Sequence, residues 1–307
     1  MSPSISSNGH SKGNLTLTGA EETLLLTLLA RAHDAESPYP ILNDQYALEL
    51  VSQIRDRGYD FERTSRGGPV PKRFGHSVAM RGRMLDIYTE KFLRRHPGPA
   101  TVLHLACGLD TRSMRVRWQG EGRLWIDADL KEVVKLRQKL IKEPELELGR
   151  GERGEYRLMQ PNIHDSAWPS DCNIPTDRPI LILFEGLTPY LTPDELYSFL
   201  QQTVHYFSSR GVHGEIYFDA IGSFMYYVIS YRYKAALKLM GTRVSYYLDD
   251  PKTLEQKVAG LKFQGRIFKT LDLHKIGPFG WVVTCLGWLI DLFGLTGRIG
   301  GAYRYEF

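Results

Sequence analysis

The sequence predicts an α/β protein built on a mostly parallel sheet, with helices before the sheet and a helical insert near its end. From residue 100 onward, short apolar strands alternate with helical segments, which is the pattern of parallel strands joined by crossover helices. The first of these strands ends in a turn of small residues, and the second ends at a carboxylate. Ligands of open α/β sheets bind at this edge.

Three helices are expected before the first strand, over Thr18–Ala35, Leu42–Ile54 and Val78–Arg95. Thr18 and Glu21 have the spacing of a capping box, which predicts where the first helix begins. Asp44 lies near the start of the second helix, and the glycines and prolines of Thr64–Pro71 predict a loop before the third. The third helix carries apolar residues at helical spacing.

Five strands are expected after these helices, because five short apolar runs are bounded by turn-forming or charged residues. They are Thr101–Leu105, Arg123–Ile126, Tyr156–Met159, Ile180–Phe184 and Glu215–Ala220. Helices are expected over Lys131–Ile141 and Pro193–Phe207, the latter with Asp194 and Glu195 in its first turn, where negative charge is favourable. Lys142–Glu155 is charged and contains glycine, which predicts a solvated loop.

The chain is interpreted as one domain, over 15–307, that follows a tail. Residues 1–14 are rich in serine, glycine and asparagine, which predicts a disordered tail rather than a signal peptide or an anchor. The domain divides into a helical cap over 15–98, a ligand-binding core over 99–222, a helical insert or lid over 223–260, and a C-terminal core with an apolar segment over 261–307. The insert is rich in tyrosine over Phe224–Tyr247.

Composition places the chain among ordinary globular proteins. It has 307 residues, of which 42% are hydrophobic and 24% charged, enough to bury a large core. The net charge of +4 is mixed along the chain and forms no basic stripe, so nucleic acid is not an expected partner. The three cysteines form no metal-binding spacing, so no metal site is expected, and they indicate a reducing, cytoplasmic compartment.

The most apolar stretch is Trp281–Leu295, which contains Asp291. A membrane-spanning helix needs about 20 apolar residues, so this stretch is too short to span. A buried or amphipathic helix is favoured over one that contacts a membrane, and no stable membrane insertion is expected.

The turn after the first strand indicates a nucleoside-bearing ligand. Small residues around Gly108 let a ligand approach the backbone, and Asp129 follows 21 residues later, at the end of the second strand. A dinucleotide fingerprint needs three glycines in a G-x-G-x-x-G pattern, whereas this turn has one. A nucleoside without phosphates therefore fits better than a dinucleotide. Asp127 ends the same strand, and spacing alone does not separate it from Asp129 as the ribose ligand.

Several segments, in order, resemble the leucine carboxyl methyltransferase superfamily, and within it the tetracenomycin-type O-methyltransferases of polyketide synthesis. The matching segments are Thr23–Ala32, Ser37–Asp44, Arg81–Asp86, Gly108–Arg112, Asp129–Arg137, Glu185–Leu191 and Ala302–Phe307. Each motif alone is weak, but their order and spacing cover roughly residues 15 to 307 and make the resemblance specific.

This resemblance implies a Rossmann-like class I methyltransferase fold with S-adenosylmethionine as the methyl donor. At the methionine end, it implies that Arg81 pairs with the carboxylate and that Glu185 lies near the amine. It implies that Ala106 and Gly108 pack under the cofactor and that Asp129 binds the ribose hydroxyls. Asn162 and Ile163 would lie beside the adenine. It also implies that the insert covers a small-molecule substrate, with Tyr190, Tyr226, Tyr227 and Tyr231 as candidate substrate contacts.

Three positions depart from the family pattern. Ala106 stands where glycine is common, a small change because alanine is nearly as small. Asn162 stands where aspartate is common; its carbonyl oxygen still accepts from the adenine amino group, but the charge is lost. Arg137 lies near the usual place of a lysine and keeps the charge.

Each site residue also has a structural interpretation. Asp129 could cap the helix that follows it, and Arg81 could pair on a helix surface with Asp86. Arg112 could tie the glycine turn to the next helix, and His104 is expected to be a hydrogen-bonded core residue. Glu185 ends a wholly apolar strand, where an unpaired carboxylate would be expensive, so a cationic ligand group is a favoured partner.

The function expected from this pattern is O-methylation of a small apolar metabolite. Methyl transfer is an in-line displacement, which requires an enzyme chiefly to hold the reacting atoms in line. No catalytic base is evident, which favours a carboxylate or an acidic hydroxyl as acceptor. The alternatives are a related enzyme recruited for cyclisation or rearrangement without methylation, a protein carboxyl methyltransferase, and a non-catalytic binding subunit. The sequence identifies neither the acceptor nor the oligomeric state.

Overall fold

The computed structural model describes residues 20–61, 72–147, 153–232, 234, 238, 243–269, 289–290 and 292–307. The expected tail over 1–14, the capping threonine Thr18 and the loop Thr64–Pro71 lie outside these residues, as does most of Trp281–Leu295. Within the described residues, no helix is both long enough and apolar enough to cross a membrane.

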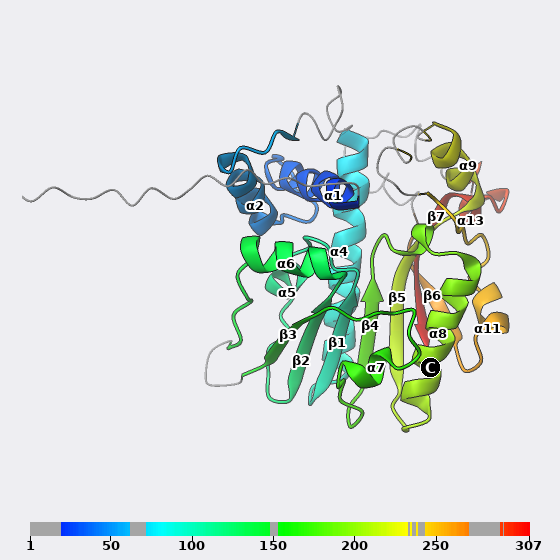
Figure 1. The fold of residues 1–307 in the computed structure, drawn as a ribbon. Coiled ribbons are helices and arrows are strands. Elements are labelled where there is room, and N and C mark those ends of the chain that lie inside the picture. Colours follow the sequence, from blue (N-terminus) through cyan, green and yellow to red (C-terminus); the bar gives the residue numbers. More distant parts are fainter. Residues whose placement is uncertain are drawn as a thin grey trace, which may run out of the picture.

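A seven-stranded sheet forms the centre of the molecule (Figure 1), with the strand order β3-β2-β1-β4-β5-β7-β6. The strands are β1 Ala100–Leu105, β2 Arg123–Ala128, β3 Glu155–Met159, β4 Ile180–Phe184, β5 Gly214–Ile221, β6 Lys262–Lys269 and β7 Gly300–Glu306. Strands β1 to β5 pair in parallel, whereas β7 is antiparallel to both β5 and β6. The expected mostly parallel α/β sheet is confirmed, and β6 and β7 add two strands that apolar periodicity did not indicate.

Helices flank this sheet and close one end of it. They are α1 Ala20–Ala35, α2 Gln45–Asp56, α4 Lys72–Arg95, α5 Arg112–Arg115, α6 Lys131–Leu140, α7 Trp168–Asp171, α8 Pro193–Ser208, α9 Ser223–Arg232, α11 Thr253–Lys257 and α13 Thr296–Ile299, with a 3-10 turn over Thr188–Tyr190. Helix α2 begins later than expected, because Asn43 has a φ of 58° and Asp44 caps the helix by accepting from the backbone N–H of Ala47. Helix α4 begins six residues earlier than expected.

Side chains of β4 explain why its sequence is wholly apolar. Ile180, Ile182 and Phe184 belong to a cluster with α7 and α8, whereas Leu181 and Leu183 belong to a cluster with α4 on the opposite face. A strand covered on both faces favours apolar side chains at every position, unless a polar one finds buried partners. The register aligns Leu105 of β1 with the last residues of β2 and β4, so the loops after these strands meet at one edge.

A polar centre is buried inside the sheet around Asp127 of β2. Its carboxylate accepts hydrogen bonds from five side chains: His104, Ser113, Trp125, Arg137 and Tyr156. Arg112 donates to Nε2 of His104 over 3.2 Å, and since a guanidinium only donates, the proton of His104 lies on Nδ1 and is donated to Asp127. The expectation that His104 is a hydrogen-bonded core histidine is confirmed.

This polar centre predicts a pH dependence of stability. Burial alone would raise the pKa of Asp127, but Arg137 and His104 outweigh it and bring the pKa to about 2. The unfolded value is about 3.9, so the stabilisation is fully present above about pH 5 and is lost as the pH falls through the folded pKa. Between pH 6 and pH 3 this group accounts for a loss of about 1 kcal/mol in the free energy of unfolding. Urea unfolding of Asp127→Asn should show less acid sensitivity than the wild type; equal sensitivity would contradict the assignment.

Gly222, between β5 and α9, has no room for a side chain, so adding a single methyl group there should destabilise the fold. A Cβ there would lie 2.2 Å from the backbone carbonyl carbon of Arg298 and 2.2 Å from the carbonyl oxygen of Gly297. Overpacking against backbone costs about 1–3 kcal/mol, so Gly222→Ala should lower the melting temperature by roughly 5 °C. A Cβ at Gly98 meets no atom within 4 Å, so Gly98→Ala serves as the control and should change stability by less than about 0.5 kcal/mol.

Candidate active site

The glycine turn leaves β1 through two left-handed residues. Ala106 has a φ of 49° and Gly108 a φ of 52°. A left-handed backbone conformation costs alanine roughly 1 kcal/mol, because its Cβ approaches the following carbonyl oxygen. Alanine in place of glycine at position 106 therefore adds backbone strain as well as volume. A Cβ on Gly108 would lie 2.9 Å from Cδ2 of Leu24, so α1 packs directly over this side of the turn.

Two buried arginines hold the carbonyl groups of this turn. Arg137 donates through Nη1 to the carbonyl oxygens of Gly108 and Asp110, at 2.8 and 2.7 Å, and Arg31 donates to that of Leu109 at 2.8 Å. Arg137 also pairs with Asp127 over 2.6 Å. Arg137 therefore fixes the shape of the glycine turn, a role that the sequence did not indicate.

Asp129 lies at the tip of β2, directly against the glycine turn. Its Oδ2 accepts from the backbone N–H of Gly108 and its Oδ1 from that of Leu130, both over 2.7 Å. Burial raises its pKa. Leu130, not Asp129, occupies the N-cap position of α6, and no side chain caps that helix. Asp127 is fully buried, so of the two candidate ribose ligands only Asp129 is partly exposed at the edge of the sheet.

The opposite part of the site is an ion-pair chain that joins α4, β4 and β5. Arg81 donates through Nε to Glu185 over 2.7 Å and through Nη1 to Asp219 over 2.9 Å. Asp219 also accepts from the backbone N–H of Gly186 over 2.6 Å. The expected alternative, a pair between Arg81 and Asp86 on a helix surface, is wrong, because Asp86 faces the interior and bonds to Arg112 and Arg115.

Glu185 is held by two guanidinium groups. Arg81 contacts its Oε1, and Arg112, which is fully buried, donates to its Oε2 over 2.6 Å. Burial alone would raise the pKa of Glu185, but the two arginines outweigh it and bring the pKa to about 2. The sequence favoured a cationic ligand group as the partner of Glu185, but in the structure two arginines of the protein already fill that role. The carboxylate of Glu185 stays ionised at neutral pH.

Asp219 is a site residue that the sequence did not single out. Burial raises its pKa, and Arg81 acts in the opposite direction. The available signal was a single carboxylate inside the otherwise apolar run Ile216–Ile221, at the carboxyl end of β5.

The ion-pair chain continues through Arg112 to the N-terminal helices. Arg112, the first residue of α5, also pairs with Asp86 of α4 at 2.7 Å and with Asp110 of the turn at 3.2 Å, so it ties the turn to α4 as well as to the helix that follows. Arg115 and Arg31 extend the chain to Asp44 at the start of α2, at 2.7 and 3.3 Å. The full network comprises Arg31, Arg81, Arg112, Arg115, Asp44, Asp86, Asp110, Glu185 and Asp219. It has one carboxylate more than it has arginines, which suits a ligand of net positive charge.

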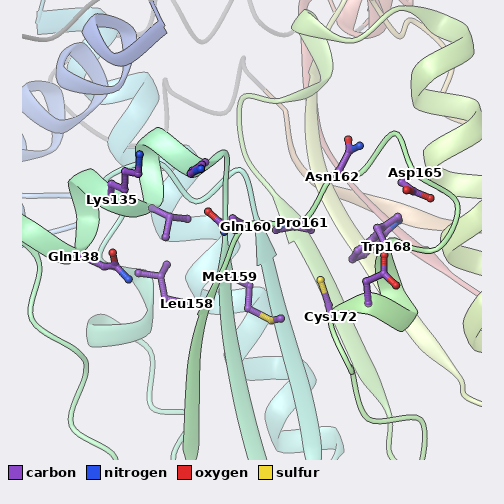
Figure 2. A pocket seen from close by; sticks show the side chains of 13 residues that line it. Lys135, Gln138, Leu158, Met159, Gln160, Pro161, Asn162, Asp165, Trp168 and Cys172 are labelled. Atoms are coloured by element: carbon purple, nitrogen blue, oxygen red, sulfur yellow. The ribbon is translucent and has the colours of Figure 1, made fainter.

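Asn162 and Ile163 follow β3 and lie in different environments. Asn162 is exposed, accepts from the backbone N–H of His164 over 3.3 Å, and lines a pocket of about 650 Å³. Figure 2 shows this pocket at the end of β3, where Gln160, Trp168 and Cys172 also line it. Ile163 instead packs against the core cluster of α7 and α8. Of the expected cofactor residues, Asn162 alone lines this pocket.

The four candidate substrate tyrosines are not gathered at one point. Tyr190 is 43% exposed and lies in the electrostatic field of Arg81 and Asp219; burial of its hydroxyl raises its pKa. Tyr226 packs against Tyr247 at 5.3 Å between ring centroids. Tyr227 and Tyr231 are exposed on α9. Tyr226 also contacts Tyr227, at 5.4 Å between ring centroids, so only Tyr190 is placed beside the site residues and the other three belong to α9.

Comparison with known proteins shows the family of this chain. The family model for leucine carboxyl methyltransferase matches residues 25–204, more than half of the chain. An S-adenosyl-L-methionine-dependent methyltransferase of Gibberella zeae is 55% identical over 296 residues, which cover 96% of this chain and 98% of that protein. The tetracenomycin polyketide synthesis O-methyltransferase of Streptomyces glaucescens is 35% identical over 251 residues, 81% of this chain and 83% of that protein. The chain belongs to the leucine carboxyl methyltransferase family and has its Rossmann-like class I fold.

Proposed function

We propose that this protein is an S-adenosylmethionine-dependent O-methyltransferase that acts on a carboxylate or an acidic hydroxyl of a small, apolar, polyketide-like metabolite. The observation that carries the proposal is the Arg81–Glu185 pair at one side of the sheet edge, with Asp129 and Gly108 at the other side. The two relatives, one named as an S-adenosyl-L-methionine-dependent methyltransferase and one as a polyketide O-methyltransferase, support it.

The described side chains fit both ends of this cofactor. Arg81 offers a guanidinium to the methionyl carboxylate, and Glu185 offers a carboxylate to the methionyl amine while Arg112 continues to hold it. Asp129 offers carboxylate oxygens to the ribose hydroxyls, and Asn162 an amide oxygen to the adenine amino group. S-adenosylmethionine has a net charge of +1, which complements the excess carboxylate of the ion-pair network.

The residues around this site position groups rather than transfer protons. When bound, S-adenosylmethionine supplies an electrophilic methyl group on a sulfonium. Glu185 and Asp219 are both paired with arginine, and His104 is buried and bonded on both ring nitrogens. None of these three groups is therefore a ready general base, which favours an acceptor that is already ionised at pH 7.

The insert supports an apolar acceptor. Tyr190, Tyr226 and Tyr247 lie around the carboxyl ends of β4 and β5, where Ser245 donates its backbone N–H to the carbonyl oxygen of Pro189 over 2.7 Å. Aromatic side chains are frequent in sites for small apolar ligands, so tyrosines near this edge favour such an acceptor over a protein tail.

Asp129→Ala should weaken cofactor binding without unfolding the protein. A hydrogen bond to a charged group is worth about 1.5–3 kcal/mol, so the dissociation constant should rise by about 10- to 100-fold in isothermal titration calorimetry. Glu145→Ala, which removes an exposed carboxylate from the loop after α6, serves as the control and should leave the affinity unchanged. Absence of binding by the wild type at near-millimolar S-adenosylmethionine would refute the proposed function.

The pH profile of methyl transfer should separate the two acceptor classes. With an apolar aromatic carboxylic acid, the rate should be flat between about pH 6 and pH 9, because such an acceptor is fully ionised there. With a simple phenol, whose pKa is about 10, the rate should rise about tenfold per pH unit, because no protein base assists. A flat profile with a phenol, measured under single-turnover conditions, would show that a protein base exists after all.

A further inference from the structure

The helix that follows β5 presents an apolar surface to solvent. None of the ten residues of α9 is buried. Phe224, Tyr227 and Tyr231 are exposed by 58%, 64% and 89%. A helix of a single globular domain normally buries one face, and none of the described residues covers this one, so it is available to a partner.

A second apolar segment lies beside α9. Leu289, Leu292, Phe293 and Leu295 are exposed, with Phe293 at 71%. This segment runs into α13, which contacts α9, and the backbone N–H of Gly222 donates to the carbonyl oxygen of Ile299 over 3.1 Å. Figure 1 shows α9 and α13 at the same end of the molecule. We call these residues of α9 and of 289–295 the insert surface.

Positively charged residues end α9 and follow it in the chain. Arg232, Lys234 and Lys238 are exposed, and Arg298 of α13 is exposed as well. Arg243 is also exposed, but it lies in the electrostatic field of Glu195 of α8. The sequence contains no aspartate or glutamate from residue 223 to residue 248. The first carboxylate after this stretch, Asp249, accepts from the backbone N–H of Ser223 over 2.7 Å. Asp250 accepts from that of Lys252, and Asp291 lies outside the described residues.

We propose that the insert surface binds the surface of a membrane that contains anionic phospholipids. Exposed aromatic and leucine side chains suit the boundary between headgroups and acyl chains, where tyrosine keeps its hydroxyl in water. Lysine and arginine beside them are attracted to anionic headgroups. The binding is peripheral, because no described helix could span a membrane.

The charge pattern argues against a second copy of the chain as the occupant. A two-fold interface sets the same patch against itself, so Arg232, Lys234 and Lys238 would approach their own copies with no carboxylate in this stretch to pair with them. Like-charge contacts of this kind disfavour association. An anionic bilayer satisfies both the apolar and the basic parts of the surface.

This placement links membrane contact to the site edge. Helix α9 begins two residues after β5, and Tyr226 of α9 packs against Tyr247, close to the segment that bonds to Pro189. Membrane binding would bring the tyrosine-rich side of the site next to the bilayer, where apolar molecules accumulate. The proposal does not depend on methyl transfer, so it is tested with no acceptor and no cofactor.

Vesicle co-sedimentation of the full-length protein provides the test. At about 0.1 M salt, vesicles of about 30% phosphatidylserine in phosphatidylcholine should pellet at least about fivefold more protein than phosphatidylcholine alone, and the difference should shrink at about 0.5 M salt. The triple variant Tyr227→Ser/Tyr231→Ser/Phe293→Ser and the double variant Lys234→Glu/Lys238→Glu should each lose most of this binding.

Matched control variants distinguish vesicle binding through the insert surface from nonspecific binding to vesicles. Tyr39 is as exposed as Tyr231 but lies in the N-terminal region, so Tyr39→Ser should bind like the wild type. Lys252→Glu/Lys257→Glu reverses the same number of exposed charges outside the insert surface and should also bind like the wild type. Thermal unfolding checks that each variant is folded. No preference of the wild type for anionic vesicles, or equal binding by the insert variants, would overturn the proposal, as would a change only in oligomeric state by gel filtration.

Discussion

The fully buried guanidinium of Arg112 is the group on which the rest of the site depends. It pairs with Asp86 of α4, with Asp110 of the glycine turn and with Glu185 after β4, and it donates to His104 of β1. Removing one partner from a buried ion network leaves an uncompensated charge and costs about 3–5 kcal/mol. The positions of the turn, of the Glu185 carboxylate and of the α4 helix are therefore set together rather than one at a time.

This constraint explains why the N-terminal helices are part of the site and not an accessory layer. Asp44 at the start of α2 and Asp86 in α4 provide carboxylates that neutralise Arg112, Arg115 and Arg31. Arg31 of α1 in turn holds the carbonyl of Leu109, and Leu24 of the same helix covers Gly108. Without these helices, the arginines beneath the glycine turn would be buried without enough counter-charge.

The parts of the fold predicted from sequence are those fixed by local pattern. The bounds of β4 agree in full because both of its faces are buried, so its apolar run has sharp ends. Asp127 and Asp129 could not be separated, because they are two residues apart and depth in the sheet, not spacing, distinguishes them. Asp219 was missed because its partner Arg81 is 138 residues away in the chain. Strand β6 was missed because it is a charged edge strand with shifts in register against β7.

The net charge of the sequence does not show how charge is distributed in this molecule, because the buried and the exposed charged groups have opposite excesses. The sequence has a formal charge of +4 that looks mixed along the chain, so no basic stripe was expected from it. In the structure, the buried network beneath the site has an excess carboxylate, whereas residues 223–248 carry four cations and no carboxylate. Desolvation requires buried arginines to be matched almost one to one, but exposed lysines need no partner. The excess carboxylate therefore lies at the site edge of the sheet, whereas Arg232, Lys234 and Lys238 of the insert stay exposed to water.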